Sequence, residues 1–139
     1  MYSPANGTTF NMAIEDTLKG KEIRLQDGKT FEDKDGFIRE NLRIKWWEDP
    51  SNSTFNSISI HPVNNLPDTL INKSSLTNTE YYGENEKPVF FGHYWLKGKP
   101  VIQRDNICCL DYSVAKKGKL VAYRFNNEKV LSSENLIYI

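Results

Sequence analysis

The residue of this sequence whose setting best suits metal chemistry is a histidine at the start of its C-terminal third. The chain of 139 residues has only two histidines, His61 and His93. His93 follows a glycine at the end of an apolar run, in the stretch "PVFFGHYWLKG" at residues 88–98. A strand end can hold an imidazole rigidly where it meets a metal ion. Because a divalent ion needs several ligands, His93 is either one ligand of a larger set or a histidine of the core or of a turn.

Two cysteines and an aspartate lie in the next apolar run. Cys108 and Cys109 are adjacent, and Asp111 follows two residues later. Neighbouring cysteines rarely reach disulfide geometry, so we expect free thiols that pack as small hydrophobic groups. A carboxylate inside a predicted strand needs partners. Asp111 therefore either accepts a hydrogen bond that orients His93 or makes a structural hydrogen bond or ion pair.

The composition excludes several classes of protein. Eighteen Lys and Arg residues balance eighteen Asp and Glu residues, and the two signs are interspersed along the chain. Nucleic-acid-binding proteins carry clustered positive charge, so we expect no nucleic-acid partner. No apolar stretch approaches the roughly 20 residues that cross a bilayer, and the N-terminus lacks the pattern of a signal peptide. We therefore expect no membrane partner and a reducing, cytoplasmic location.

The elements that must position these residues form three stretches of one expected α+β domain, residues 1–139. Residues 8–20 place apolar side chains on one helical face and end on Gly20, which predicts an N-terminal helix. Residues 21–87 are irregular, with Asp-Gly turn signals at residues 27–28 and 35–36 and short extended segments at residues 23–25 and 42–47. In an extended segment Trp46 and Trp47 would face opposite ways, with one of them in the core.

Residues 88–139 give the clearest pattern. Four apolar or alternating runs follow one another, and turn-like segments separate the last three, which predicts a mainly antiparallel β-meander. The first run predicts a strand at residues 89–91 that ends just before His93, with the imidazole open to solvent.

The same stretch resembles a known family of enzymes. "PVFFGHYWLKGKPVIQRDNICCLDYSVAKKGKLVAYRF" is similar to the C-terminal end of the calcineurin-like metallophosphoesterases, above all to a bacterial branch described as serine/threonine phosphatases or diadenosine-tetraphosphatase-like. The upstream stretch "LKGKEIRLQDGKTFEDKDGFIRENLRIKWW" resembles the segment that joins the catalytic halves of that branch. The resemblance covers residues 10–139.

This resemblance implies half of an α/β/β/α sandwich and a hydrolase with two divalent metal ions. His93 matches the histidine of the closing Gly-His motif, a metal ligand in the family, and Asp111 would support it. The Asp-x-His, Gly-Asp-x-x-Asp and Gly-Asn-His motifs that supply the other ligands are absent from this chain. We therefore expect the C-terminal part of a phosphoesterase that acts on its phosphoester substrate only when joined to the missing half. Alone, it would be inactive and would bind no metal tightly.

Two other functions fit the same residues. One is a non-catalytic binding or self-assembly module derived from that family, and the other is an unrelated small β-rich protein in which "GHYW" is a coincidence. Without the missing half, apolar sheet surface or an unpaired edge would be exposed, so we expect a homodimer. The alternative is that residues 21–87 fold back over this surface, with Trp46 and Trp47 covering it.

Overall fold

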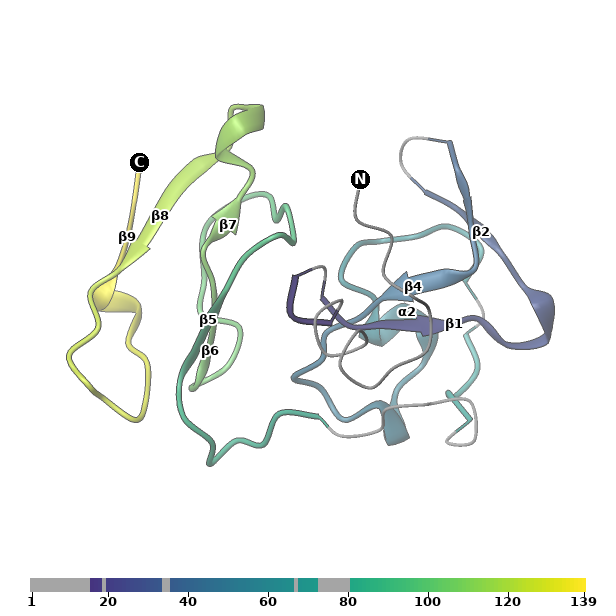
Figure 1. Ribbon diagram of the computed structural model, residues 1–139, viewed down its shortest axis with the longest axis horizontal. Helices are drawn as coiled ribbons and strands as arrows, with labels where there is room; N and C mark the ends of the chain where they lie inside the picture. Colours follow the sequence, from purple (N-terminus) through teal and green to yellow (C-terminus); the bar gives the residue numbers. More distant parts are fainter. Residues whose placement is uncertain (1–15, 19, 34–35, 67, 73–80) are drawn as a thin grey trace. The chain divides into compact units, whose positions relative to one another are not determined.

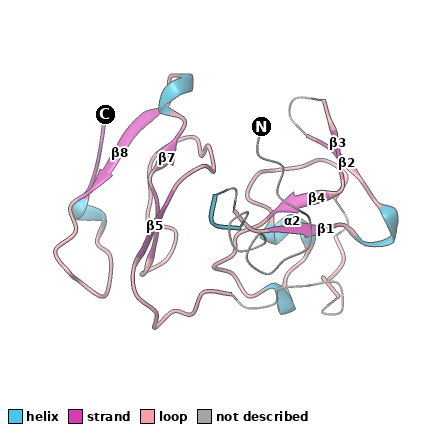
Figure 2. Ribbon diagram, in the orientation of Figure 1, coloured by secondary structure: helices cyan, strands magenta, loops and turns pink. Residues whose placement is uncertain are grey.

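The computed structural model describes residues 16–18, 20–33, 36–66, 68–72 and 81–139 (Figure 1). The chain divides into two compact units, Met1–Tyr81 and Tyr82–Ile139. The expected single domain stays a prediction, and each unit is described by itself. Figure 2 shows that the units consist of short strands and short helices joined by long loops. Four of the five strand pairings in the described part of the chain are antiparallel, which confirms the expected α+β class at a coarse level.

The predicted N-terminal helix falls mostly outside the described residues, because residues 8–15 and 19 are not among them. Residues 16–18 are helical. The N–H of Gly20 donates to the main-chain oxygen of Asp16 at 3.1 Å. Gly20 has a φ of 84°, a conformation that glycine adopts freely and that commonly ends a helix. The helix therefore stops at the glycine that the sequence indicates.

Two strand pairs form the sheet structure of the first unit. β1 (Glu22–Arg24) pairs antiparallel with β4 (Asn41–Arg43), and β2 (Phe31–Glu32) pairs antiparallel with β3 (Ile38–Arg39). Ile23 lies opposite Leu42, and both side chains are buried. The first Asp-Gly pair forms a turn within the 3-10 helix Gln26–Gly28. Its residues Asp27 and Gly28 have φ values of 57° and 65°, which are the backbone angles that Asp-Gly favours.

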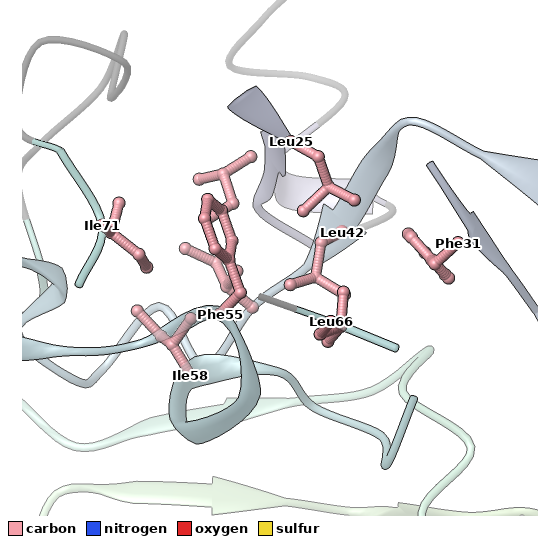
Figure 3. Close-up of a cluster of buried hydrophobic side chains, with 9 residues drawn as sticks. Leu25, Phe31, Leu42, Phe55, Ile58, Leu66 and Ile71 are labelled. Atoms are coloured by element: carbon pink, nitrogen blue, oxygen red, sulfur yellow. The ribbon is translucent and has the colours of Figure 1, made fainter. Parts of the chain in front are cut away.

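The first unit packs its core between these strands and one short helix. α2 (Phe55–Ile58) begins with a capping box in which the side chains of Thr54 and Ser57 each accept from the other residue's backbone N–H. A second short helix, the 3-10 helix Pro50–Asn52, precedes it. Figure 3 shows side chains of α2, β4 and the neighbouring loops pointing toward one another. The buried cluster comprises Ile23, Leu25, Phe31, Leu42, Ile44, Phe55, Ile58, Leu66 and Ile71.

The prediction of an extended segment at residues 42–47 is wrong at its end. β4 stops at Arg43, and Trp46 and Trp47 lie in a turn. Their rings meet edge to face, with centroids 5.4 Å apart and planes at 86°, rather than facing opposite ways. Trp47 is buried, as expected for one of the two. The turn arises because Glu48 N–H donates to Lys45 O, which closes the chain on itself.

The second unit begins with a parallel pair. β5 (Val89–Phe91) pairs with β6 (Ile107–Cys109), and this pairing is parallel rather than part of the predicted antiparallel meander. The connection at residues 92–106 contains no helix, although a crossover between parallel strands usually includes one. The rest of the meander is confirmed. β7 (Asp111–Tyr112), β8 (Lys119–Tyr123) and β9 (Leu136–Tyr138) form an antiparallel sheet in that order.

The parallel pair and the antiparallel sheet are joined at one residue. Only Leu110 separates β6 from β7, and its N–H donates to the main-chain oxygen of Phe91 at 2.9 Å. Phe90 in β5 packs against Tyr123 and Phe125, with ring centroids 5.0 and 5.5 Å apart. The buried residues of this unit are Tyr94, Pro100, Asn106, Ile107, Cys108, Cys109, Tyr112, Ser113, Val121 and Leu131. β5 thus lies against a core that fixes the position of its carboxyl end.

Candidate functional site

His93 lies two residues beyond the carboxyl end of β5. The strand ends at Phe91, as the sequence predicts, and Gly92 separates it from His93. His93 is exposed to solvent, which confirms the predicted accessibility. Its φ is 68°, a left-handed conformation that histidine adopts far less often than glycine. The Gly-His break is therefore a sharp change in backbone direction at the strand end.

Tyr94 explains this change of direction. Its side chain is only 2 % exposed, and its ring packs edge to face on Phe91 with centroids 5.0 Å apart. Trp95 also has a left-handed φ, 52°. Two left-handed residues thus flank a buried tyrosine. The core contact of Tyr94 holds the loop in place and leaves His93 at the surface.

Asp111 fixes the same loop through the backbone. Its Oδ2 accepts from the N–H of Trp95 at 3.1 Å, and its Oδ1 accepts from the N–H of Ser113 at 3.0 Å. Its main-chain oxygen accepts from the N–H of Leu96 at 3.1 Å. A Cβ added to Gly92 would lie 3.7 Å from the Cβ of Asp111. The expected structural hydrogen bonds of Asp111 are therefore present, and its support of His93 as a metal ligand stays a prediction.

Tyr112 and Ser113, which follow Asp111, anchor the next part of the same loop. The hydroxyl of Ser113 donates to the main-chain oxygen of Leu96 at 3.1 Å. The N–H of Val101 donates to Oη of Tyr112 at 2.9 Å. Burial raises the pKa of the Tyr112 hydroxyl, which keeps it protonated. Residues 96–101 are thus bound at both ends to the end of β7.

A buried asparagine holds the other end of β5. Asn106 is 1 % exposed, and its main-chain oxygen accepts from the N–H of Val89 at 2.8 Å. Its Nδ2 donates to the main-chain oxygens of Gly83 and Glu86, and its Oδ1 accepts from Nε of Arg104 at 3.0 Å. The sequence analysis missed this residue. Its one local signal is an Asp-Asn pair between two apolar runs, which indicates a turn but not these partners.

The two cysteines have no catalytic geometry. Both thiols are free, and both residues are fully buried in β6. Burial raises the pKa of Cys108 from its ordinary value of 9.0 to about 11, and burial together with the nearby Asp111 charge raises that of Cys109 to about 12. The thiolate is the nucleophile, so these neutral thiols are inert at neutral pH. The expectation of free, core-packed cysteines is confirmed.

The other histidine belongs to the first unit. His61 is exposed and follows α2, and its main-chain oxygen accepts from the hydroxyl of Ser59 at 2.6 Å. It therefore offers a surface imidazole in a different unit from His93.

The residues that the structure describes do not form a metal site by themselves. Among them, no three His, Cys, Asp or Glu side chains lie close enough together to hold one ion. His93 supplies one imidazole, and both carboxylate oxygens of its neighbour Asp111 already accept from backbone N–H groups. A two-metal centre needs several further ligands. The described part of the chain thus fits at most one position of such a centre.

The described helices are all too short or too polar to cross a membrane.

No protein-family model, no curated protein and no solved structure matches this chain significantly.

Proposed function

We propose that this chain is the C-terminal part of a metal-dependent phosphoesterase, to which it contributes His93 as one metal ligand. One observation carries the proposal. An exposed imidazole lies just beyond the carboxyl end of a parallel strand, on a loop that the core contact of Tyr94 and the carboxylate of Asp111 hold in place. In open sheets with parallel strands, ligands bind outside the carboxyl ends of those strands. The position of His93 just beyond the end of β5 supports the proposal.

The pairing of β5 supports the same proposal. A parallel pair of two strands, β5 and β6, is marginal as an independent sheet. Parallel strands normally belong to larger sheets with both faces covered. We infer that β5 and β6 continue into a larger sheet, as half of an α/β/β/α sandwich would require. The remaining metal ligands would then come from that larger sheet, and we assign no step of hydrolysis to the residues described above.

The proposal is tested by comparing this chain with the longer protein encoded by its reading frame, extended upstream of Met1. The longer protein should hydrolyse p-nitrophenyl phosphate in the presence of Mn²⁺, and this chain alone should not. His93→Ala should lower the rate by at least about 100-fold, the upper range for residues that only support a metal ligand. His61→Ala is the matched control, because it removes an exposed imidazole that the proposal does not use, and it should leave the rate unchanged.

Two results would overturn the proposal. One is Mn²⁺-stimulated turnover by this chain alone that depends on His93. The other is an upstream reading frame that encodes no further Asp, His or Asn motifs able to complete the ligand set.

A second candidate function is a non-catalytic self-assembly module, and one face of the β8–β9 pair favours it. Leu120 exchanges backbone hydrogen bonds with Ile139, and Ala122 lies opposite Ile137. Their side chains share one face of the pair, and all four are exposed. Leu120, Ile137 and Ile139 are 56, 55 and 84 % exposed. Contiguous apolar surface of this kind marks an interaction site on many proteins.

A further inference from the structure

Two segments of the second unit, one of which also carries His93, together bear four lysines. Lys97 and Lys99 lie in the connection between β5 and β6, and Lys116 and Lys117 lie in the turn between β7 and β8. All four are exposed. Figure 1 shows both segments at the same end of the second unit.

Hydrogen bonds hold the two segments together. The hydroxyl of Ser113 donates to Leu96 O, and Tyr112 Oη accepts from the N–H of Val101. These bonds bind both ends of the loop that carries Lys97 and Lys99 to the residues just before the turn that carries Lys116 and Lys117. The Nζ of Lys116 also lies 4.4 Å from the ring centroid of Trp95, two residues from His93. Specific contacts thus hold the two segments that carry the four lysines beside each other.

The charge of this lysine cluster is not neutralised within the described part of the chain. None of the four forms an ion pair with a described residue. Between residues 92 and 127 the only acidic residues are Asp105 and Asp111, and the carboxylate of Asp111 accepts from two backbone N–H groups. The second unit carries nine Lys and Arg against six Asp and Glu, a net charge of +3 that the neutral total of the chain conceals.

Such a cluster is stabilised when an anion binds to it. Two like charges about 10 Å apart repel by roughly 0.4 kcal/mol in water. An anion bound between them attracts each lysine and so offsets this repulsion. Lysine ammonium groups act as compact point charges that suit phosphate oxygens. The cluster comes from two short segments and lacks the extended basic groove that follows a nucleic-acid strand.

We propose that Lys97, Lys99, Lys116 and Lys117 bind the anionic part of a phosphate-bearing ligand with two or more negative charges. The identification of this ligand with a phosphoester substrate at His93 rests on the proposed function. Anion binding by the lysine cluster is independent of the proposed function, because it needs neither a metal ion nor turnover.

The test is a titration of the ¹⁵N-labelled chain with inorganic diphosphate in the presence of EDTA, followed by two-dimensional NMR. Sulfate at equal ionic strength is the control for screening. Diphosphate should shift the amide signals of residues 93–99 and 113–118 more than sulfate does. The triple variant Lys97→Gln, Lys99→Gln, Lys116→Gln should raise the Kd by at least about tenfold, or roughly 1.4 kcal/mol.

A second triple variant, Lys29→Gln, Lys87→Gln, Lys129→Gln, removes the same charge from exposed positions outside the cluster and should keep the Kd of the unchanged chain. The spectra of both variants also report whether the fold is intact.

Equal shifts with sulfate, shifts centred elsewhere, or equal Kd values for the two triple variants would overturn the proposal. Diphosphate binding without His93-dependent hydrolysis in the longer protein would overturn the phosphoesterase alone, and hydrolysis without diphosphate binding would overturn the lysine site alone.

Discussion

At the scale of single residues, Asp111 is the side chain on which the loop around His93 depends most directly. Asp111→Ala removes the acceptor of the Trp95 and Ser113 N–H groups. Partly buried donors without a partner cost about 1–3 kcal/mol, so we expect the free energy of unfolding to fall by that amount. Urea denaturation monitored by tryptophan fluorescence measures the change.

Asp105→Ala is the matched control for this prediction, because Asp105 is an exposed aspartate in the same unit. A surface substitution of this kind should change stability by less than about 0.5 kcal/mol. If the two variants have the same stability, Asp111 does not hold the loop. The amide signal of Trp95 gives an independent measurement, since it should move in Asp111→Ala and stay in place in Asp105→Ala.

Sequence reasoning finds His93 but not the residues that hold its loop. A glycine followed by a histidine at the end of an apolar run predicts a strand end, and β5 ends where the pattern indicates. The partners of Asp111 are backbone N–H groups, one of them 16 residues away along the chain. A backbone N–H carries no sequence signal, so the alternatives for Asp111 could not be separated before the fold was known.

At the scale of elements, the turn between β7 and β8 requires a glycine at position 118. Ser113 and Lys117 both have left-handed φ values, and the N–H of Gly118 donates to Ser113 O at 2.9 Å. A Cβ on Gly118 would lie 1.9 Å from the main-chain oxygen of Tyr112. Because this neighbour is backbone, Gly118→Ala should lower the free energy of unfolding by about 3 kcal/mol or more.

Gly83→Ala is the control, measured by the same denaturation experiment. A Cβ on Gly83 would make an ordinary contact of 3.4 Å with the flexible side chain of Glu86. We expect this variant to stay close to the unchanged chain. Equal stabilities for Gly118→Ala and Gly83→Ala would show that the turn has a different conformation in solution.

The direction of strand pairing is the part of the fold that the sequence predicts least well. Alternation of residue types in Lys119–Tyr123 identifies a strand and its two faces, because side chains alternate across a sheet. The same alternation is compatible with a parallel or an antiparallel neighbour. The parallel pairing of β5 and β6 depends on the path of residues 92–106, whose anchors Tyr112 and Ser113 lie outside that segment. The predicted four-stranded meander was therefore right only for its last three strands.

At the scale of the whole molecule, the exposed face of β8 and β9 predicts self-association. We expect sedimentation velocity at roughly micromolar concentrations to show a sedimentation coefficient that rises with concentration. Ile137→Lys places a charge in the middle of this face and should shift the equilibrium toward monomer. Val130→Lys is the control, because Val130 is similarly exposed, at 61 %, but lies outside the strands.

A monomer at all concentrations, or equal behaviour of the two lysine variants, would rule out assembly through this face. The question could not be decided from the sequence, since the alternation in β8 does not say which of its two faces stays exposed. Which apolar residues remain exposed depends on the order and direction of strands, and these follow from contacts between distant segments. The same holds for the lysine cluster, whose two halves are separated by β6 and β7.

The left-handed backbone of His93 has a consequence for protein engineering. An L-residue in this conformation costs roughly 1–2 kcal/mol, whereas glycine adopts it freely. Methods that optimise a sequence for stability replace such residues, because the replacement relieves backbone strain. A thermostabilised version of this chain designed without regard to function would therefore lose its candidate metal ligand among its first substitutions. Position 93 should be held fixed in any such redesign.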